Sequence, residues 1–345
     1  MNPGMIVRLR PAGPWRIGPA SGARNGVDHI FHSDSLYSAV SSAIAQIDWI
    51  EEWFMATAES GAAPQVRFSS CFPYQKDTLY VPPPRTLWPP PHAPGKVRWQ
   101  GARFVPISIV QRLLGDQPID EDRWTVDGAT GCVLPADRAQ SGPFRNAIRS
   151  SAAVDRVTGE SVGHTTACLE FAPDAGLWCV VSFSDEESRE RWAEPVRGAF
   201  RLLADSGLGG ERSRGWGRAE APMFKEGALP GLIVDAPQSN EHGWWLLSVF
   251  SPGEHDSVDW SRGNYSLMTR SGRVESRAGW GAPKRASRVV AEGAVLVGAS
   301  APVGAAVDVA PEGFAHPVYR YGYALCVPVP SGPSRARQQS EGGAA

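Results

Sequence analysis

The amino-acid sequence predicts an α+β fold, and two observations carry that prediction. In the first part of the chain, the segments follow the order strand, helix, strands, helix, strand, which is typical of a ferredoxin-like (RRM-like) domain. In the second part, strand-like segments continue while helical periodicity is nearly absent. We therefore expect two ferredoxin-like domains, of which the second is smaller, β-rich and degenerate.

Chain length and composition favour this two-domain division. With 345 residues, of which 42% are hydrophobic, the chain can bury a sizeable core and is long enough for one large or two ordinary domains. The composition loosens at residues 227–243, so we predict an N-terminal domain over 1–226, a linker over 227–243 and a C-terminal domain over 244–330. The tail, 331–345, is rich in Ser, Gly, Gln and Arg and is expected to be disordered.

The cysteine spacing and the hydropathy exclude several classes of protein. Five cysteines are scattered without a Cys-x-x-Cys pair, which excludes a disulfide scaffold and a zinc knuckle and indicates reduced thiols in a cytosol. The sequence has neither a signal-like N-terminus nor a run of 18 apolar residues. We expect a cytoplasmic protein that uses no membrane, metal or cofactor.

The opening strand, Met5–Arg10, leads through a Pro/Gly loop to a predicted helix. Ser33 or Asp34 can cap this helix, and its apolar stripe consists of Leu36, Val40, Ile44 and Ile47. His32 and Ser33 then lie at a helix N-terminus, where free N–H groups favour an anion such as an RNA phosphate. The alternative for His32 is a packed or capping histidine.

Two insertions are predicted within the first domain. Seven prolines between Val81 and Gly95 require an extended segment, which is expected to form a rigid surface insertion or to dock on a partner. Residues 141–170 contain a basic stretch around Arg145 and Arg149, and a turn signal at Thr158-Gly159. They predict a protruding hairpin.

A buried strand, Leu177–Phe183, is predicted to feed the second helix, Ser184–Ser206. Ser184 and Glu187 fit a capping box, and the apolar positions at helical spacing are Trp192, Val196, Phe200 and Leu203. Pro195 should kink this helix because it removes a hydrogen bond. Gly207 is a plausible C-cap.

A glycine-rich loop follows this helix, with five glycines and three arginines within residues 207–218. It follows a helix rather than a strand, so it is no Rossmann fingerprint, and it lacks the Gly-Lys-Ser/Thr ending of a P-loop. Bare backbone at its glycines can approach a polyanion, the arginines can pair with phosphate and the tryptophan can stack on a base. The residues that we predict to bind RNA here are Gly209, Gly210, Arg212, Ser213, Arg214, Gly215 and Trp216. The alternative is a turn that only reverses the chain.

The formal net charge of −2 does not suggest a nucleic-acid binder, but the charges are unevenly distributed. Residues 262–288 hold seven Lys/Arg and one Glu, whereas acidic residues collect at 116–127 and 185–194. This asymmetry favours one basic face, to which Arg270 and Arg273 of a predicted 265–277 hairpin would contribute. Ordinary solvated surface is the alternative.

Four stretches carry a resemblance to a known family. The helix, the loop Gly-Leu-Gly-Gly-Glu-Arg-Ser-Arg-Gly-Trp-Gly and the following strand resemble the glycine-rich loop of the RAMP superfamily of CRISPR proteins. The stretches at 32–37 (His-Ser-Asp-Ser-Leu-Tyr), 155–159 (Asp-Arg-Val-Thr-Gly) and 316–322 (His-Pro-Val-Tyr-Arg-Tyr-Gly) resemble the fourth subunit of the type III-A (Csm) effector complex. In this order they span nearly the whole chain.

The resemblance implies two RAMP domains and a non-catalytic, RNA-binding subunit. In this family the 141–170 insertion is thumb-like and lies against the guide RNA, so Arg145, Arg149 and Arg156 would contact phosphates. The subunit would bind the repeat-derived 5′ tag of the crRNA. Its partners would be the large polymerase-type subunit and the backbone RAMP subunit, with target RNA reached only indirectly.

The sequence offers little catalytic chemistry. Its seven histidines show no metal-ligand spacing, and no carboxylate cluster resembles a two-metal site. If the chain were instead a metal-independent RAMP ribonuclease, His29 or His32 would be its candidate catalytic residue. A protein-only adaptor and a subunit of a related type III-B or III-D complex are also compatible with the sequence.

Overall fold

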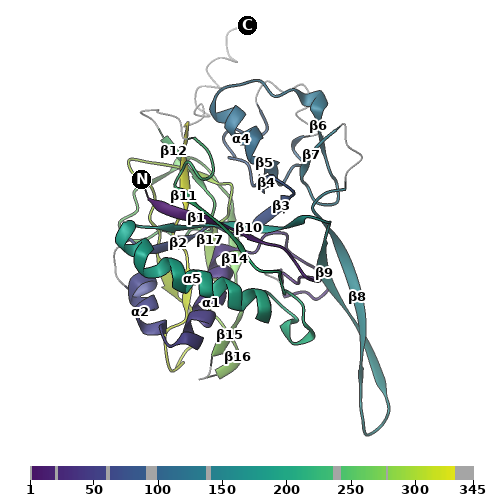
Figure 1. Cartoon of the computed structure of the whole chain (residues 1–345). Helices are drawn as coiled ribbons and strands as arrows, with labels where there is room; N and C mark the ends of the chain where they lie inside the picture. Colours follow the sequence, from purple (N-terminus) through teal and green to yellow (C-terminus); the bar gives the residue numbers. More distant parts are fainter. Residues whose placement is uncertain are drawn as a thin grey trace.

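The computed structural model describes residues 2–19, 22–59, 63–90, 99–136, 141–235, 242–276 and 279–330 (Figure 1). The predicted α+β class is confirmed. The strands in the described sheets pair antiparallel, and the helices within these ranges are α1 (Ser33–Ile44), α2 (Ile50–Phe54), α4 (Ile107–Leu114) and α5 (Glu186–Ser206). The last two predicted proline-rich positions, Pro91 and Pro94, and the 331–345 tail lie outside the described residues.

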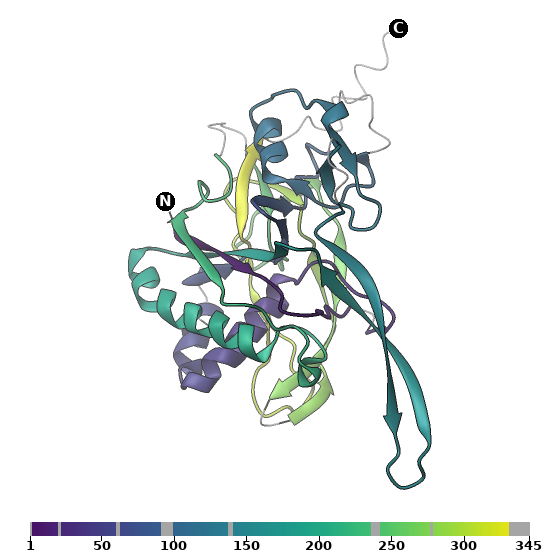
Figure 2. The same ribbon diagram turned by 45° about the vertical axis from the view of Figure 1, so that its right-hand side comes forward.

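The larger sheet has the order β11-β1-β10-β3-β4-β5, and β2 also pairs with β10. Its longest strands are β1 (Pro3–Leu9) and β10 (Ala175–Phe183), and β11 (Met223–Ala228) forms the edge beside β1. The other strands are β2 (Val66–Phe68), β3 (Phe72–Gln75), β4 (Thr78–Val81) and β5 (Val105–Pro106). Helix α1 follows β1, and α5 joins β10 to β11. Figures 1 and 2 show α1, α2 and α5 together on one side of this sheet.

Helix α5 agrees with its predicted apolar face but not with its predicted cap. Trp192, Val196, Phe200 and Leu203 are all buried. The N-cap is Asp185, whose carboxylate accepts a hydrogen bond from the amide of Ser188, so the Ser184–Glu187 capping box is wrong. The carboxylate can accept from the free amides of the first turn, which is why Asp is favoured there. The helix continues through Pro195, and Gly207, with φ 92°, is the C-cap as predicted.

Helix α1 begins at Ser33, and His32 is its N-cap residue, without a side-chain cap bond. Leu36, Val40 and Ile44 are buried, as predicted. Ile47 is not part of this stripe, because α1 ends at Ile44 and a 3-10 turn, η1 (Ala45–Ile47), leaves the Ile47 side chain exposed. After η1 the chain restarts as α2 and continues as the π-helical turn η2 (Met55–Glu59).

The proline-rich segment differs from its prediction. Pro82, Pro83 and Pro84 are buried rather than on the surface. The indole of Trp245 donates to the carbonyl of Pro82 (3.1 Å), and the amide of Arg85 donates to Gly293 O (3.1 Å). Residues 82–85 therefore connect the two halves of the chain by hydrogen bonds. After it come α4, η3 (Glu121–Arg123), β6 (Trp124–Val126) and β7 (Val133–Pro135), at the top of Figure 1.

The predicted protruding hairpin is confirmed. Strand β8 (Phe144–Val154) pairs with β9 (Ser161–Phe171) over eleven positions, from Phe144 opposite Phe171 to Val154 opposite Ser161. Both views show it extending away from the body of the molecule. Only its base packs against the core, since most of its outer side chains are exposed.

The second half contains no helix within 242–276 and 279–330. Its main sheet has the order β13-β18-β12-β21, formed by β12 (His242–Leu246), β13 (Val258–Asn264), β18 (Val295–Gly298) and β21 (Cys326–Pro330). Three smaller pairs follow: β14 (Leu267–Arg270) with β17 (Ser287–Val290), β15 (Arg273–Ser276) with β16 (Gly279–Pro283), and β19 (Ala306–Asp308) with β20 (Tyr319–Tyr321). The predicted 265–277 hairpin is therefore wrong, because β14 and β15 pair with different strands.

The two halves share one hydrophobic core. Trp245, Val295 and Tyr321 of the second half belong to the same buried cluster as α1, α5 and the larger sheet. The rings of Tyr37 and Tyr321 stack with centroids 4.2 Å apart. A common core fixes the orientation of the halves, so surface segments from both can build one face.

Candidate nucleic-acid interface

The backbone of the glycine-rich loop packs closely on other backbone of the same chain. A Cβ atom on Gly209 would lie 2.3 Å from the carbonyl oxygen of Arg16, and one on Gly217 would lie 2.0 Å from that of Leu208. The amide of Gly210 donates to Arg16 O (2.8 Å), and a Cβ there would meet the Arg16 side chain at 3.2 Å. The close approach that the glycines predict is therefore present, but for Gly209 and Gly210 it is made to the protein itself.

Gly215 differs from these glycines. Its φ is 79°, in the left-handed region, yet no atom lies within 4 Å of the position that a Cβ would take. It directly follows the short 3-10 turn η4 (Arg212–Arg214). Of the loop glycines, Gly215 is the one whose bare backbone faces open space.

The loop arginines connect the β8–β9 hairpin to the β15–β16 arm. Arg214 donates from Nη1 to Ser151 Oγ (3.1 Å) and from Nη2 to His164 Nε2 (2.9 Å), and these two residues face each other across the hairpin. Arg212 forms an ion pair with Glu275 on β15. In Figure 2 the loop at the end of α5 lies between the hairpin and the arm. Three segments far apart in sequence thus meet at this loop.

The hairpin adds two arginines on one face of β8. Arg145 and Arg149 both pair with Glu170 on β9, and their side chains are 77% and 57% exposed. Arg156 lies exposed in the turn at the hairpin tip, which Asp155 stabilises by accepting from the amide of Val157 (2.7 Å). Arg156 therefore lies at the tip, beyond the Ser151–His164 pair that Arg214 contacts.

The remaining loop and arm residues lie on the same surface. Ser213 is exposed and Trp216 is half-buried. Arg273 on β15 is exposed, and its guanidinium donates to Gly281 O (2.6 Å). The sequence-predicted arginines that the structure leaves exposed or partly exposed are Arg145, Arg149, Arg156, Arg212, Arg214 and Arg273. Within the described ranges their carboxylate partners are Glu170, Glu211 and Glu275.

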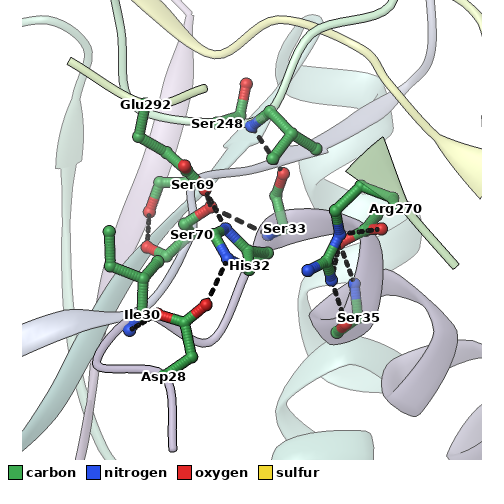
Figure 3. Close-up of polar contacts among 12 residues, drawn as sticks. Asp28, Ile30, His32, Ser33, Ser35, Ser69, Ser70, Ser248, Arg270 and Glu292 are labelled. Atoms are coloured by element: carbon green, nitrogen blue, oxygen red, sulfur yellow. Dashed lines mark hydrogen bonds and ion pairs between the residues drawn. The ribbon is translucent and has the colours of Figure 1, made fainter. Parts of the chain in front are cut away.

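The other three predicted RNA contacts lie in the interior (Figure 3). His32 is 3% exposed and lies between two carboxylates: Nδ1 bonds Glu292 Oε1 (2.7 Å) and Nε2 bonds Asp28 Oδ2 (3.1 Å). Two ionised carboxylates accept only, so both ring nitrogens carry protons and the ring is an imidazolium. Burial alone would lower the pKa of His32, but the charge of Glu292 and the two hydrogen bonds raise it to about 10.

Arg270 and Ser33 belong to the same buried region. The guanidinium of Arg270 donates from Nε to Asp34 Oδ2 (3.0 Å) and from Nη2 to Asp34 Oδ1 (2.9 Å), and Arg320 donates to Oδ2 as well (2.8 Å). Ser33 accepts a hydrogen bond from the amide of Val249 (3.1 Å). Burial would raise the pKa of Asp34, but the charge of Arg270 lowers it to about 2. Direct RNA contact by His32, Ser33 or Arg270 does not agree with this burial. They join α1 to the second half instead.

His29, the other histidine considered for catalysis, is also buried. Its Nε2 bonds Asn146 Oδ1 (2.9 Å), and Arg103 donates to its Nδ1 (3.0 Å). Burial lowers the pKa of His29, and the charge of Arg103 lowers it further, against the opposing hydrogen bond with Asn146. The ring is therefore neutral near pH 7, with both nitrogens engaged.

Several residues of this region were missed from the sequence. Arg16 accepts a hydrogen bond from the loop backbone, and Glu292 pairs with His32. His164 accepts a hydrogen bond from Arg214, and Glu275 forms an ion pair with Arg212. None stands in a motif, because each acts on a partner far away in the chain. The one available signal was Glu275, the single acidic residue within the basic stretch 262–288.

Comparisons with known proteins find similarity to one family. Residues 239–329 match the family described as the CRISPR Csm4 C-terminal domain. The chain is 24% identical over 335 residues to the CRISPR system Cms protein Csm4 of Thermococcus onnurineus (strain NA1), covering 95% of this chain and 98% of that one. The predicted resemblance to the fourth subunit of the type III-A Csm complex is confirmed.

Solved Csm4-containing structures share the fold. One, a Csm3–Csm4 subcomplex of the type III-A CRISPR-Cas interference complex, matches with a TM-score of 0.64 at 16% identity, over 95% of this chain and 99% of the other. Another, a Csm1–Csm4 cassette in complex with cA4, matches with a TM-score of 0.58 at 20% identity, over 95% and 98%. The Csm4-like match therefore extends over both halves.

The described residues were also searched for metal sites and membrane spans. They contain no group of three or more His, Cys, Asp or Glu side chains that could hold a metal ion. Among the helices of the described ranges, none is both long and apolar enough to cross a membrane.

Proposed function

We propose that this chain is a subunit of a type III-A Csm complex that binds the repeat-derived 5′ tag of the crRNA. The RNA surface consists of the β8–β9 hairpin, the glycine-rich loop and the β15–β16 arm. Its contacts are Arg145, Arg149, Arg156, Arg212, Ser213, Arg214, Gly215, Trp216 and Arg273. Gly209, Gly210, His32, Ser33 and Arg270 support this surface from within.

The observation that carries the proposal is the pair of connections made by the loop arginines. Arg214 bonds the hairpin at Ser151 and His164, and Arg212 bonds the arm at Glu275, so one loop holds two basic protrusions in a fixed relation. Exposed ion pairs are worth only about 0–1 kcal/mol each. A backbone phosphate can pair with the same guanidinium in the bidentate manner of a carboxylate, so it can replace a glutamate at little cost.

The proposed role is non-catalytic. Both candidate histidines for cleavage are buried and fully bonded, His29 to Asn146 and Arg103 and His32 to two carboxylates. A general acid or base must reach the proton that it transfers, directly or through one water. This supports an RNA-holding subunit over the metal-independent ribonuclease.

The proposed partners follow from the solved complexes. Csm4 occurs with Csm1 in one set of structures and with Csm3 in another, and a Csm4-like chain would contact the corresponding large polymerase-type and backbone RAMP subunits. Target RNA would be reached only through the complex. We also propose two RAMP domains, of which the second is β-rich and degenerate. The family match that begins at residue 239 supports a boundary at 227–243. The proposed location is cytoplasmic.

The test is RNA binding by the Arg212→Ala/Arg214→Ala double variant across a salt series. Fluorescence anisotropy with a labelled 5′-tag oligonucleotide should give weaker binding, and the log–log salt slope should flatten by up to about 1.4, because each phosphate contact on a single strand contributes about 0.7. The Arg212→Lys/Arg214→Lys variant keeps the charge and should retain most of the slope.

The matched control removes two arginines far from the loop, Arg112 on α4 and Arg123 in η3. This control should bind as the wild type does. Equal affinity and slope for the loop variant and the wild type would contradict the proposal. If the wild-type chain captures the large subunit but does not bind RNA, the protein-only adaptor is favoured. If the chain cleaves repeat RNA in EDTA, the ribonuclease is favoured.

A further inference from the structure

Lys284 lies at the base of the β15–β16 arm, directly after β16. Its amide donates to Gly272 O (2.9 Å), and its side chain passes over Gly272, where a Cβ would stand 3.9 Å from the Lys284 Cδ. On the opposite strand, Arg273 pairs with Pro283. Lys284 thus adjoins the exposed basic arm while being half-buried itself.

Lys284 has two positive and two negative charges as neighbours. Its charged neighbours are Arg270, Arg320, Asp34 and Glu275. Burial lowers the pKa of Lys284, and the charge of Arg320 lowers it further. A half-buried ammonium beside two guanidinium groups is stable only if an anion compensates it.

Asp34 and Glu275 raise the pKa of Lys284, but each is already paired with arginine. Both oxygens of Asp34 are engaged by Arg270, and Oδ2 also accepts from Arg320. Glu275 is paired with Arg212 of the glycine loop. In the part of the chain that the structure describes, the Lys284 ammonium makes neither a hydrogen bond nor an ion pair, although it has three donors.

We propose that Lys284 is an anion subsite that takes one backbone phosphate of the guide RNA, with Arg270 and Arg320 behind it strengthening the positive field. The inference rests on the proposed RNA surface and extends it from the glycine loop past Arg273 to the base of the arm. Arg270 thereby acts through the field rather than by direct contact, which agrees with its burial. The bound phosphate adds a negative charge that, unlike Asp34 and Glu275, is not already paired with arginine.

The experiment is competitive acylation of amines on the full chain, read by mass spectrometry. The sequence has four lysines, and Lys76 and Lys225 serve as internal controls on exposed sites. The chain is labelled in chloride buffer, with inorganic phosphate, and with the 5′-tag oligonucleotide, whose binding is followed separately by anisotropy. An anion that raises the Lys284 pKa by one unit lowers its neutral, reactive fraction about tenfold.

We expect the RNA to protect Lys284 while Lys76 and Lys225 keep their reactivity, whether or not inorganic phosphate protects it too. Bound RNA that leaves Lys284 reactive overturns the inference while the proposed function survives. Protection by phosphate but not by bound RNA also overturns it, because the site then takes a free anion. Failure of the chain to bind RNA overturns the proposed function and this subsite with it.

Two variants give an independent readout. Lys284→Met should flatten the RNA salt slope by about 0.7, the contribution of one phosphate on a single strand. Lys284→Arg should keep the slope, because it keeps the charge. A Lys284→Met variant that is folded by circular dichroism and has the wild-type slope would refute the subsite.

Discussion

Gly215 and Gly217 offer a controlled test of what the glycine-rich loop does. Both have φ 79°, so replacement by alanine imposes the same left-handed conformation at either position. That conformation costs an L-residue about 1–2 kcal/mol. The positions differ in their surroundings: the Gly215 Cβ would meet nothing within 4 Å, whereas the Gly217 Cβ would lie 2.0 Å from Leu208 O.

The difference in stability can be worked from the bonds at Gly217. The amide of Leu208 donates to Gly217 O (3.0 Å), and the amide of Gly217 donates to Pro14 O (3.0 Å). A methyl group at 2.0 Å forces the two segments apart and breaks both bonds. At about 0.5–1.5 kcal/mol each, Gly217→Ala should be about 1–3 kcal/mol less stable than Gly215→Ala.

The assay is thermal unfolding of the two variants side by side. Unfolding entropy for 345 residues is about 0.7 kcal/mol per kelvin, so Gly217→Ala should melt about 1.5–4 °C below Gly215→Ala. Equal melting temperatures, or a lower one for Gly215→Ala, would refute the reasoning that the glycines serve internal packing.

Two further predictions concern the buried histidines. His32→Gln removes a cation between the buried Glu292 and the partly buried Asp28 and should lower the free energy of unfolding at pH 7 by about 3–5 kcal/mol. Folding raises the pKa of His32 from 6.5 to about 10. The stability difference between wild type and His32→Gln should therefore be full below pH 6.5 and be lost as the pH rises through 10. Urea unfolding at several pH values measures this difference, and a difference that grows with pH contradicts the assignment. His29→Ala should leave guide-RNA maturation and target cleavage by the assembled complex essentially unchanged in single-turnover assays, and a loss of several decades in rate would reveal an active site.

Local patterns predicted the elements whose stability is local. The apolar positions of α5, the β8–β9 hairpin and the place of His32 at the start of α1 follow from spacing over a few residues, and the structure has all three. The capping box at Ser184 failed because a neighbouring residue of equal capping ability, Asp185, took the position. Propensity does not separate adjacent candidates of the same kind.

The candidate site was predicted only in part, because its decisive contacts are non-local. Arg270 and Asp34 are separated by 236 residues, and His32 and Glu292 by 260. A basic residue in a basic stretch looks the same in sequence whether its charge meets solvent or a buried carboxylate. The sequence therefore marks the basic segments as a group but does not say that Arg270 turns inward while Arg273 stays outside.

The same non-local contacts explain how a chain with a net charge of −2 can present a basic surface. The hairpin, the glycine loop and the arm each carry only two or three arginines, too few for tight binding alone. The loop fixes them relative to one another through Arg212 and Arg214, and the buried charges around His32 and Asp34 fix the half that bears the arm. For the proposed RNA binding, groups that are already positioned lose less entropy when the complex forms. A variant that loosens this scaffold, such as Gly217→Ala, should therefore weaken RNA binding without removing any charge, and it should leave the salt slope of the remaining binding unchanged.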